Sequence, residues 1–238
     1  GQSTLWSRVP GGEATTVLET PGSIRSVTLA DNGDQIAFLH APPAPSDEDA
    51  ENGDRSWSVH HWSLSSGGEP RLVAAAGTQG IPSGWSVSEN QSPSFSDDGS
   101  RVFFGTVPPA TPPAELSELE SQVDVEIWHW LDAQLMTVQN VRVNQERRRS
   151  YQAVAHLEDG GRVVQLAHLD LPSVQVPHGG TASVGIARDT ERYGIESSWE
   201  SPNFTDVWLV DVGTGERTLI MERTQGNPSL SPDAAYLT

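Results

Sequence analysis

Short runs of alternating apolar and polar residues, separated by turns rich in Gly and Asp, repeat along this chain. One unit consists of a short strand, a polar turn and a second apolar strand. It occurs at residues 26–39, 92–104, 174–187 and 227–238. Asp-Gly sequences in such turns supply the positive-φ positions that connect two antiparallel strands tightly. The pattern therefore predicts four hairpins of this first kind.

A second unit alternates with the first and consists of a strand, a Gly-rich turn and another strand. It occurs at residues 5–18, 62–73, 151–166 and 207–220. Period-2 alternation around Gly turns is typical of β-hairpins. Two hairpins in series form a four-stranded meander, and meanders repeated along a chain are typical of β-propeller blades. We therefore expect an all-β fold of four-stranded antiparallel blades, in which the first unit supplies strands a and b and the second supplies strands c and d.

The order of the units predicts about four blade equivalents within residues 1–238, as a single β-propeller domain or part of one. The chain starts with a c–d hairpin, continues through three whole blades and ends with an a–b hairpin. In one architecture the two terminal hairpins complete a composite blade and close a four-bladed ring. In the other the chain is an arc of a larger propeller, whose open edges would need covering. The residue pattern leaves both architectures open.

Two insertions interrupt the repeats, and both fall between strands b and c. The first, at about 41–56, holds five carboxylates and three prolines, a composition that cannot pack a core and predicts an exposed loop. The second, at about 107–150, contains a short helix candidate at 115–120 and a strand-like segment at 124–130. Equivalent connections lie on one face of a propeller, so we expect both insertions on the same face, where loops often carry function.

Composition and charge exclude several classes of function. The 238 residues include 14 Arg, no Lys and 32 Asp or Glu, so the net charge is −18. Such a charge opposes binding to nucleic acid or to an anionic membrane surface, and no apolar run approaches the ~20 residues of a membrane span. The absence of Cys excludes disulfides and thiol nucleophiles. The acidity fits salt adaptation, in which screening reduces self-repulsion, and the absence of Lys also fits codon bias.

The first residue of the chain is Gly, and no signal peptide precedes the repeats. We therefore expect a mature or excised chain.

The catalytic and metal-binding motifs are weak. Residues 84–88 resemble a nucleophile elbow around Ser86, but such an elbow needs Gly-x-Ser-x-Gly at a strand-to-helix turn, and Ser88 replaces the second Gly. We expect a d-to-a connection there and no catalytic residue in this chain. His60 and His61 are adjacent, and neighbouring residues on a strand point to opposite faces, so we expect no metal site and no cofactor.

We expect structural roles for two further features. His129 lies between two Trp residues and is expected to be an ordinary strand residue. Asp98 and Asp233 are expected to brace their turns through hydrogen bonds to the backbone.

The one dense positive patch lies at the end of the second insertion. Arg147, Arg148 and Arg149 are the candidate binding residues of this chain. Guanidinium groups bind carboxylates in bidentate fashion, so the patch suits a ligand such as a peptide terminus. The structural alternative is pairing with nearby Glu residues or with the acidic surface of an adjacent domain.

A resemblance to a known family supports the propeller prediction. Five segments carry it, at residues 84–105, 125–130, 149–154, 197–200 and 206–211. Through these segments the chain resembles TolB-like, WD40-like propeller repeats and, more narrowly, the N-terminal propeller of bacterial prolyl oligopeptidase-family (dipeptidyl peptidase IV-like) serine peptidases.

The resemblance implies a non-catalytic module. In that family the propeller precedes an α/β-hydrolase domain that holds the Ser-Asp-His triad, and this chain contains neither that domain nor a matching elbow. Dipeptidyl-peptidase relatives hold the substrate amino terminus with two carboxylates, for which Glu196 and Glu200 are the nearest but poor candidates. The implied role is to gate access to a peptidase site, in a periplasmic or extracellular protein with the cytoplasm as the alternative. The implied partner is the C-terminal α/β-hydrolase domain of the same protein, and the likeness favours the arc over the closed ring.

Two other hypotheses stay open. A free-standing TolB-like scaffold would bind protein or peptide partners on one face. An enzyme with its site in a propeller channel is disfavoured, because neither paired carboxylates nor a His cluster recurs at equivalent blade positions. In the arc architecture, open propeller edges allow self-association.

Overall fold

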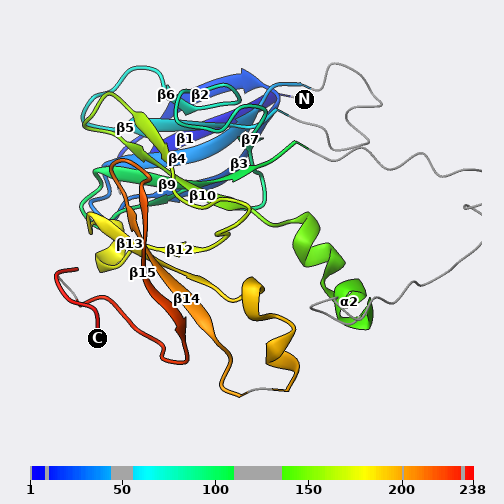
Figure 1. The fold of residues 1–238 in the computed structure, drawn as a ribbon. Helices are drawn as coiled ribbons and strands as arrows, with labels where there is room; N and C mark the ends of the chain where they lie inside the picture. Colours follow the sequence, from blue (N-terminus) through cyan, green and yellow to red (C-terminus); the bar gives the residue numbers. More distant parts are fainter. Residues whose placement is uncertain (1, 9–10, 44–55, 110–135, 200, 232–233) are drawn as a thin grey trace, which may run out of the picture.

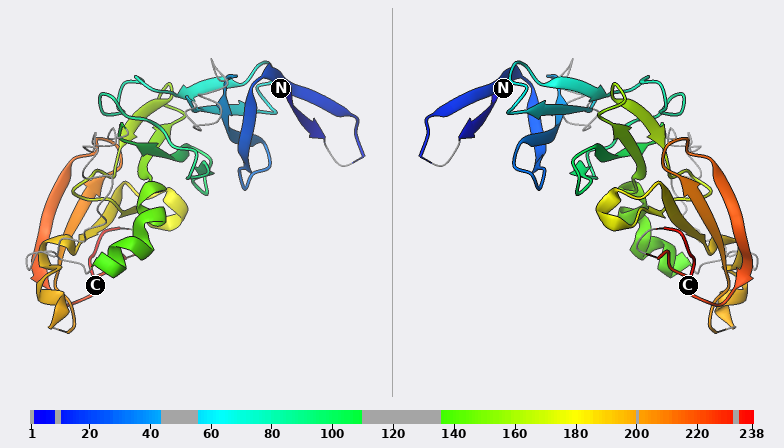
Figure 2. Two further views of the ribbon diagram at one scale, coloured as in Figure 1. Left: turned by 90° about the vertical axis from the view of Figure 1, so that its right-hand side faces the viewer. Right: turned by 90° about the vertical axis from the view of Figure 1, so that its left-hand side faces the viewer.

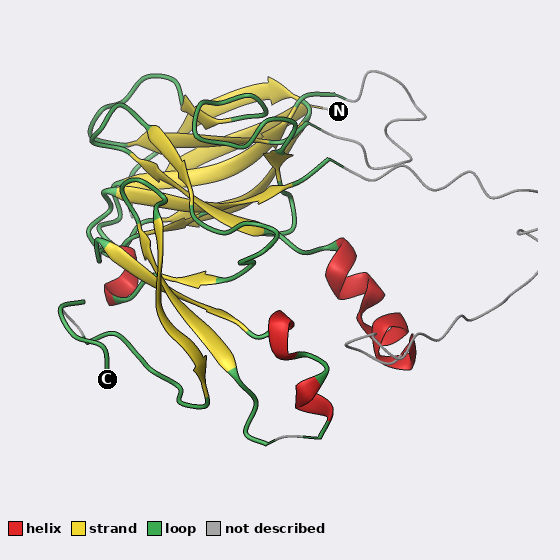
Figure 3. Cartoon of the chain, viewed as in Figure 1, coloured by secondary structure: helices red, strands yellow, loops and turns green. Residues whose placement is uncertain are grey.

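The computed structural model describes residues 2–8, 11–43, 56–109, 136–199, 201–231 and 234–238. These residues fold into antiparallel sheets, accompanied by one α-helix and three 3-10 turns (Figures 1 and 3). The prediction of a nearly all-β chain with antiparallel sheets is confirmed. Among the helices of the described residues, none combines the length and the apolar character that spanning a membrane requires.

The chain begins with a two-stranded sheet formed by β1 (Gln2–Arg8) and β2 (Ala14–Pro21). Side chains along β1 alternate between exposed and partly buried positions, as expected for a strand with one face toward solvent. Leu5 lies directly opposite Leu18, and a bulge follows Leu5. This sheet is the first predicted c–d hairpin.

The next sheet has four strands in sequential order. They are β3 (Ser23–Leu29), β4 (Gln35–Ala41), β5 (Ser58–Ser63) and β6 (Arg71–Ala74). The turn between β3 and β4 is closed by a hydrogen bond from the N–H of Gly33 to the carbonyl oxygen of Ala30, and the φ of Gly33 is 70°. An Asn-Gly turn thus joins the strands as the sequence predicts.

The third sheet has five strands, and β9 and β10 are its centre. Its members are β7 (Ser86–Val87), β8 (Ser94–Phe95), β9 (Arg101–Val107), β10 (Tyr151–His156) and β11 (Arg162–Gln165). Both β7 and β8 pair with β9 at successive positions, whereas β10 pairs with β9 and β11. Strand a is therefore interrupted and supplied by two short segments.

The fourth sheet again has four strands in order. They are β12 (Val174–Gln175), β13 (Val184–Asp189), β14 (Thr205–Asp211) and β15 (Arg217–Thr224). After β15 a last hairpin forms, in which Leu230 bridges Leu237. The hairpins predicted from the alternating units are therefore present, although several strands are shorter or longer than the sequence pattern indicated.

The core lies between the sheets. Its central strands, β9 and β10, are buried on both faces, because a sheet stacked between two others is covered on both sides. Phe104 and Val154 are fully buried, and both belong to one apolar cluster that also includes Leu39 and Val210 from the neighbouring sheets. Figure 2 shows the sheets following one another along an open arc, with β1–β2 at one end and β14–β15 at the other.

The two long connections of the chain run from β4 to β5 and from β9 to β10. Residues 44–55 and 110–135 lie outside the described residues, and so do the helix candidate at 115–120, the strand-like segment at 124–130 and His129. Helix α2 (Met136–Arg147) precedes β10 and was not predicted.

The ends of the two insertions lie near each other. Trp57 directly precedes β5 and bridges Val87 of β7, and Val87 pairs with Thr106 near the end of β9. The structure therefore brings the ends of both connections to the same side of the sheets.

A glycine substitution tests the close approach of the β6–β7 connection to β11. Gly80 and Gly77 both have positive φ, 98° and 80°, but a Cβ at Gly80 would overlap the carbonyl group of Val163, whereas a Cβ at Gly77 would meet open space. We expect Gly80→Ala to lower the free energy of unfolding by about 1 to 3 kcal/mol more than Gly77→Ala, the excess being the overlap term. Urea unfolding of both variants measures this difference. Equal losses would contradict the close approach.

Candidate functional site

A charged cleft of about 560 Å³ lies between α2 and the end of β13. One wall is formed by Gln139, Arg142, Val143 and Glu146 of α2, whose spacing of i, i+3, i+4 and i+7 places them on one face of the helix. Arg149, just beyond the end of the helix, completes this wall. Its other wall consists of Pro172, Arg188, Asp189, Thr190 and Glu191. The lining thus holds three guanidinium groups and three carboxylates, a balanced set in a chain of net charge −18.

Of the three predicted binding residues, Arg149 lines this cleft. Its Nε donates to Glu146 Oε2 at 2.7 Å and its Nη2 donates to Oε1 at 2.5 Å. This bidentate bond lowers the pKa of the Glu146 carboxyl, with burial opposing it, and also raises the pKa of Arg149. Glu191 contributes to the raised pKa of Arg149 electrostatically. The structure therefore shows the pairing with a nearby Glu that the sequence raised as the structural alternative.

Arg147 and Arg148 do not line the cleft. Arg147 is the last residue of α2, where a positive charge complements the partial negative charge of the helix end. The N–H groups of Arg148 and Arg149 bond back to the carbonyl oxygens of Gln145 and Glu146 and complete the helix terminus. A binding role for the three arginines stays a prediction.

Arg188 holds the opposite wall. Its Nη2 donates to the carbonyl oxygen of Pro228, which ties the end of β13 to the segment after β15. Its Nε is buried and has no hydrogen-bond partner among the described residues. A buried donor without an acceptor costs free energy, so a ligand or a water that accepts a hydrogen bond from Arg188 Nε would remove this cost.

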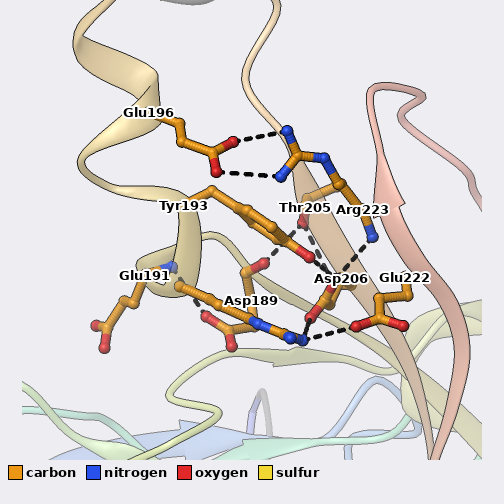
Figure 4. Close-up of polar contacts among 9 residues, drawn as sticks. Asp189, Glu191, Tyr193, Glu196, Thr205, Asp206, Glu222 and Arg223 are labelled. Atoms are coloured by element: carbon orange, nitrogen blue, oxygen red, sulfur yellow. Dashed lines mark hydrogen bonds and ion pairs between the residues drawn. The ribbon is translucent and has the colours of Figure 1, made fainter.

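A polar network centred on Asp206 holds the connection between β13 and β14 (Figure 4). Asp206 is 2% exposed, and its Oδ1 accepts the hydroxyl of Tyr193 at 2.5 Å and the N–H of Arg223 at 2.8 Å. Its Oδ2 accepts Nη1 of Arg192 at 3.3 Å. Burial raises the pKa of the Asp206 carboxyl, but these hydrogen bonds outweigh it, and the pKa lies below its usual value of 3.8.

Two exposed ion pairs extend the network. Arg192 also pairs with Glu222 at 2.9 Å. Arg223 pairs with Glu196 at 2.9 Å and lies over the ring of Phe204, 4.0 Å from the ring centroid. Arg223 has a φ of 51°, and in this left-handed conformation its N–H bonds to the buried carboxylate.

Residues at the start of the connection between β13 and β14 belong both to the Asp206 network and to the cleft. The Oδ1 of Asp189 accepts the N–H of Glu191 at 2.9 Å, and the carbonyl oxygen of Asp189 accepts the hydroxyl of Thr205 at 3.2 Å. The 3-10 turns Glu191–Tyr193 and Glu196–Ser198 are thereby attached to β13 and β14. The network therefore positions the carboxylates of one cleft wall.

The structure also locates the two carboxylates considered as a substrate clamp. Glu196 is engaged with Arg223, and Glu200 lies outside the described residues. The described residues therefore show Glu196 in an ion pair with arginine and not beside a second carboxylate.

The elbow around Ser86 is not formed. Ser86 begins β7, and the residues after Val87 pass through a turn into β8 rather than into a helix. Ser88 is buried, and its Oγ lies 2.6 Å from the Oγ of Ser150. Residues 75–85 connect β6 to β7, and Ser86 lies in β7 itself, which pairs with β9.

The adjacent histidines point to opposite faces of their sheet, as predicted. His60 stacks on Phe38 with ring centroids 5.5 Å apart, and burial, followed by the charge of His40, lowers its pKa to about 4. His61 lies on the other face, where its Nε2 is 2.8 Å from Oε1 of Gln35. In the described parts of the chain, no three His, Asp or Glu side chains gather in a way that could hold a metal ion.

The turn before β9 is braced as predicted. Oδ1 of Asp98 accepts the hydroxyl of Ser96 at 2.6 Å and the N–H of Ser100 at 3.0 Å. The equivalent residue of the last hairpin, Asp233, lies outside the described residues.

Comparison with known proteins identifies no family directly. No protein-family model matches the sequence, and no curated protein matches it significantly. Among solved structures, TolB from Acinetobacter baumannii is 14% identical over 98% of this chain and 42% of that chain, with a TM-score of 0.35. A prolyl endopeptidase is 11% identical over 91% of this chain and 26% of that chain, with a TM-score of 0.42.

A third similar structure is the β-propeller domain of the Trilobed protease from Pyrococcus furiosus. It is 12% identical over 85% of this chain and 42% of that chain, with a TM-score of 0.37. This chain therefore spans less than half the length of each of the three structures. With TM-scores below 0.5, the description of the fold rests on the strand pairing of this chain itself.

The buried carboxylate of Asp206 is expected to make the free energy of unfolding depend on pH. Because the pKa of Asp206 is lowered by folding, its ionised form stabilises the fold above the unfolded-state pKa of about 3.9, and this stabilisation is lost as the pH falls through the folded-state pKa. We expect Asp206→Asn to lower the free energy of unfolding by about 2 to 4 kcal/mol at pH 6 and by less at pH 3. Urea unfolding at both pH values measures the two differences.

The matched control is Asp170→Asn. Asp170 is an exposed residue paired with Arg217 at 2.9 Å, and such surface pairs contribute less than about 1 kcal/mol. If Asp206→Asn costs no more than this control, the network does not hold the connection between β13 and β14.

Proposed function

We propose that this chain is a non-catalytic β-propeller module of a prolyl oligopeptidase-like serine peptidase, and that it gates substrate access to an α/β-hydrolase domain of the same protein. The observation that supports the proposal is the succession of four-stranded antiparallel meanders along an open arc (Figure 2). A ring of such sheets surrounds a central channel, and a module of this shape restricts the size of what reaches a site behind it. The arc corresponds to about four blade equivalents of a larger propeller.

One side of the sheets is the candidate surface for the hydrolase domain. Helix α2 and the connection at 190–204 both follow the second strand of their sheets. Loops on a rigid scaffold carry recognition more often than the core strands do. On this proposal the catalytic serine belongs to the partner domain, and the periplasm or the extracellular space is the location.

The alternative function is a free-standing TolB-like scaffold that binds protein or peptide partners. The cleft between α2 and β13 supports it, because its lining combines three guanidinium groups with three carboxylates, a set that suits a ligand carrying both charges, such as a peptide. Charge-assisted bonds to guanidinium are well suited to carboxylates. In this alternative Arg142 and Arg188 bind a peptide carboxylate, and Arg149 takes part by exchanging its bond with Glu146 for one with the peptide. Arg147 and Arg148 add positive charge beside the cleft.

A serine-directed covalent probe tests the peptidase proposal. We expect a fluorophosphonate to leave the 238-residue chain unlabelled and to label the full-length protein in a hydrolase domain encoded after Thr238. Mass spectrometry of the labelled peptide identifies the serine. Labelling at Ser86 would contradict the non-catalytic role, and a reading frame that ends at Thr238 would contradict the peptidase proposal and leave the scaffold.

A binding titration tests the scaffold alternative. We expect a short peptide with a free carboxyl terminus and acidic residues to bind, and Arg142→Gln to weaken this binding about tenfold through loss of one charge-assisted bond. Arg148→Gln is the matched control, since Arg148 ends the same segment without lining the cleft. Isothermal calorimetry measures both variants, and an equal loss for Arg148→Gln would show that the cleft is not the site.

A further inference from the structure

Glu146 lies between two arginines on the wall of the cleft that α2 supplies. Arg142 is four residues before it and Arg149 is three residues after it, and residues three or four apart are neighbours on a helix surface. The bond to Arg149 lowers the pKa of the Glu146 carboxyl, burial opposes this effect, and the charge of Arg142 adds to the lowering. Two guanidinium groups of this wall therefore act on one carboxylate that belongs to the chain itself.

The bond between Glu146 and Arg149 has the geometry that a bound carboxylate ligand would have. Nε and Nη2 of Arg149 donate to the two carboxylate oxygens of Glu146 at 2.7 and 2.5 Å. Two parallel N–H···O bonds of this kind are a common way in which a guanidinium group recognises a carboxylate. This edge of Arg149 is therefore occupied, and a ligand can take it only where Glu146 is displaced.

The pair is exposed enough to be exchanged. The side chain of Arg149 is 34% exposed and that of Glu146 is 48% exposed. Water and salt screen such pairs, and holding two long side chains in one geometry costs entropy, so exposed ion pairs contribute little to stability. Glu146 can therefore leave Arg149 at small cost to the fold.

The opposite wall combines a fixed donor with two carboxylates. Arg188 is held by the carbonyl oxygen of Pro228, and its buried Nε has no hydrogen-bond partner among the described residues. Asp189 and Glu191 belong to the same wall, and Glu191 acts electrostatically on Arg149 across the cleft. These carboxylates repel a ligand that carries only negative charge, whereas a short peptide also brings an ammonium group.

We propose that Glu146 is an internal competitor, which occupies the carboxylate-binding position of the cleft and keeps the affinity for peptides low. A ligand carboxylate binds by replacing Glu146 on the Nε–Nη2 edge of Arg149, on the wall that also holds Arg142 and opposite Arg188. The contact between Glu146 and Arg149 is thus autoinhibitory. This inference rests on the scaffold alternative proposed above and concerns the regulation of the same cleft.

Binding in this way exchanges one ion pair of Arg149 for another. Removal of the competitor therefore raises the affinity by about as much as the bond between Glu146 and Arg149 contributes. For an exposed ion pair, this contribution corresponds to a factor of about two to five in an equilibrium constant. We therefore expect a modest gain that depends on Arg149.

A titration with triglycine measures the competition. Triglycine carries one carboxylate and one ammonium group, and nitrogen–proton correlation NMR of the 238-residue chain detects weak binding and resolves arginine Nε–H signals. Glu146→Gln keeps the shape of the side chain and removes its charge. We expect this variant to lower the dissociation constant about threefold. Acid would protonate the ligand as well, so the substitution is the cleaner test.

Asp159→Asn is the matched control. Asp159 accepts a hydrogen bond from Arg162 at 2.6 Å in an ion pair with the same i,i+3 spacing, and neither residue is among those that line this cleft. The control changes the net charge of the chain by the same amount, and we expect it to leave the dissociation constant unchanged. An equal gain in both variants would show that only the overall charge matters and would overturn the inference.

A double-mutant cycle tests whether the competition acts through Arg149. Arg149→Gln removes the shared donor, so adding Glu146→Gln to it should produce no further gain. Triglycine amide lacks the carboxylate and should bind the unmodified chain and the Glu146→Gln variant equally. In the unmodified chain, the Nε–H signal of Arg149 should shift as triglycine saturates the cleft, because the acceptor of this group changes.

The outcomes separate this inference from the function on which it rests. If the unmodified chain binds triglycine but the Glu146→Gln variant binds it no more tightly, or if the gain persists with Arg149→Gln, the inference is wrong and the scaffold alternative stands. If neither the unmodified chain nor the Glu146→Gln variant binds triglycine, both are contradicted. Circular dichroism and thermal unfolding of each variant verify that the fold is retained.

Discussion

The stacking of sheets face to face, with the middle sheet covered on both sides, is the constraint on which the rest of this structure depends. Three consecutive residues of β10, Ala153, Val154 and Ala155, are fully buried, although alternate strand residues point to opposite faces. Burial of both faces requires a sheet before and a sheet after.

The charged features are attached to this scaffold rather than part of it. Asp206 is buried at the start of β14, and its bonds to Tyr193 and to the N–H of Arg223 hold the 3-10 turns between β13 and β14. The first of those turns begins at Glu191, which lines the cleft together with Asp189, the last residue of β13. A buried carboxylate must be bonded to be tolerated, so the network both satisfies Asp206 and fixes one wall of the cleft.

Helix α2 and the Asp206 network could not be predicted from the local sequence pattern. Helix α2 escaped prediction because Val138, Val141 and Val143 make no continuous apolar stripe, and all three are exposed, whereas helix prediction relies on a buried face. The Asp206 network was missed because Asp206 meets Tyr193 and Arg223, which lie 13 and 17 residues away in the chain. A buried polar residue within an apolar strand was the one available hint.

Local pattern determined the hairpins and their order, because period-2 alternation and Gly-containing turns act over a few residues. It also determined the turn bracing by Asp98 and the rejection of an elbow at Ser86. Only the tertiary structure decided that Arg149 pairs with Glu146 and lines a cleft, while Arg147 and Arg148 do not. Adjacent residues in a sequence separate in space according to the element that carries them, and that element is placed by packing against distant strands.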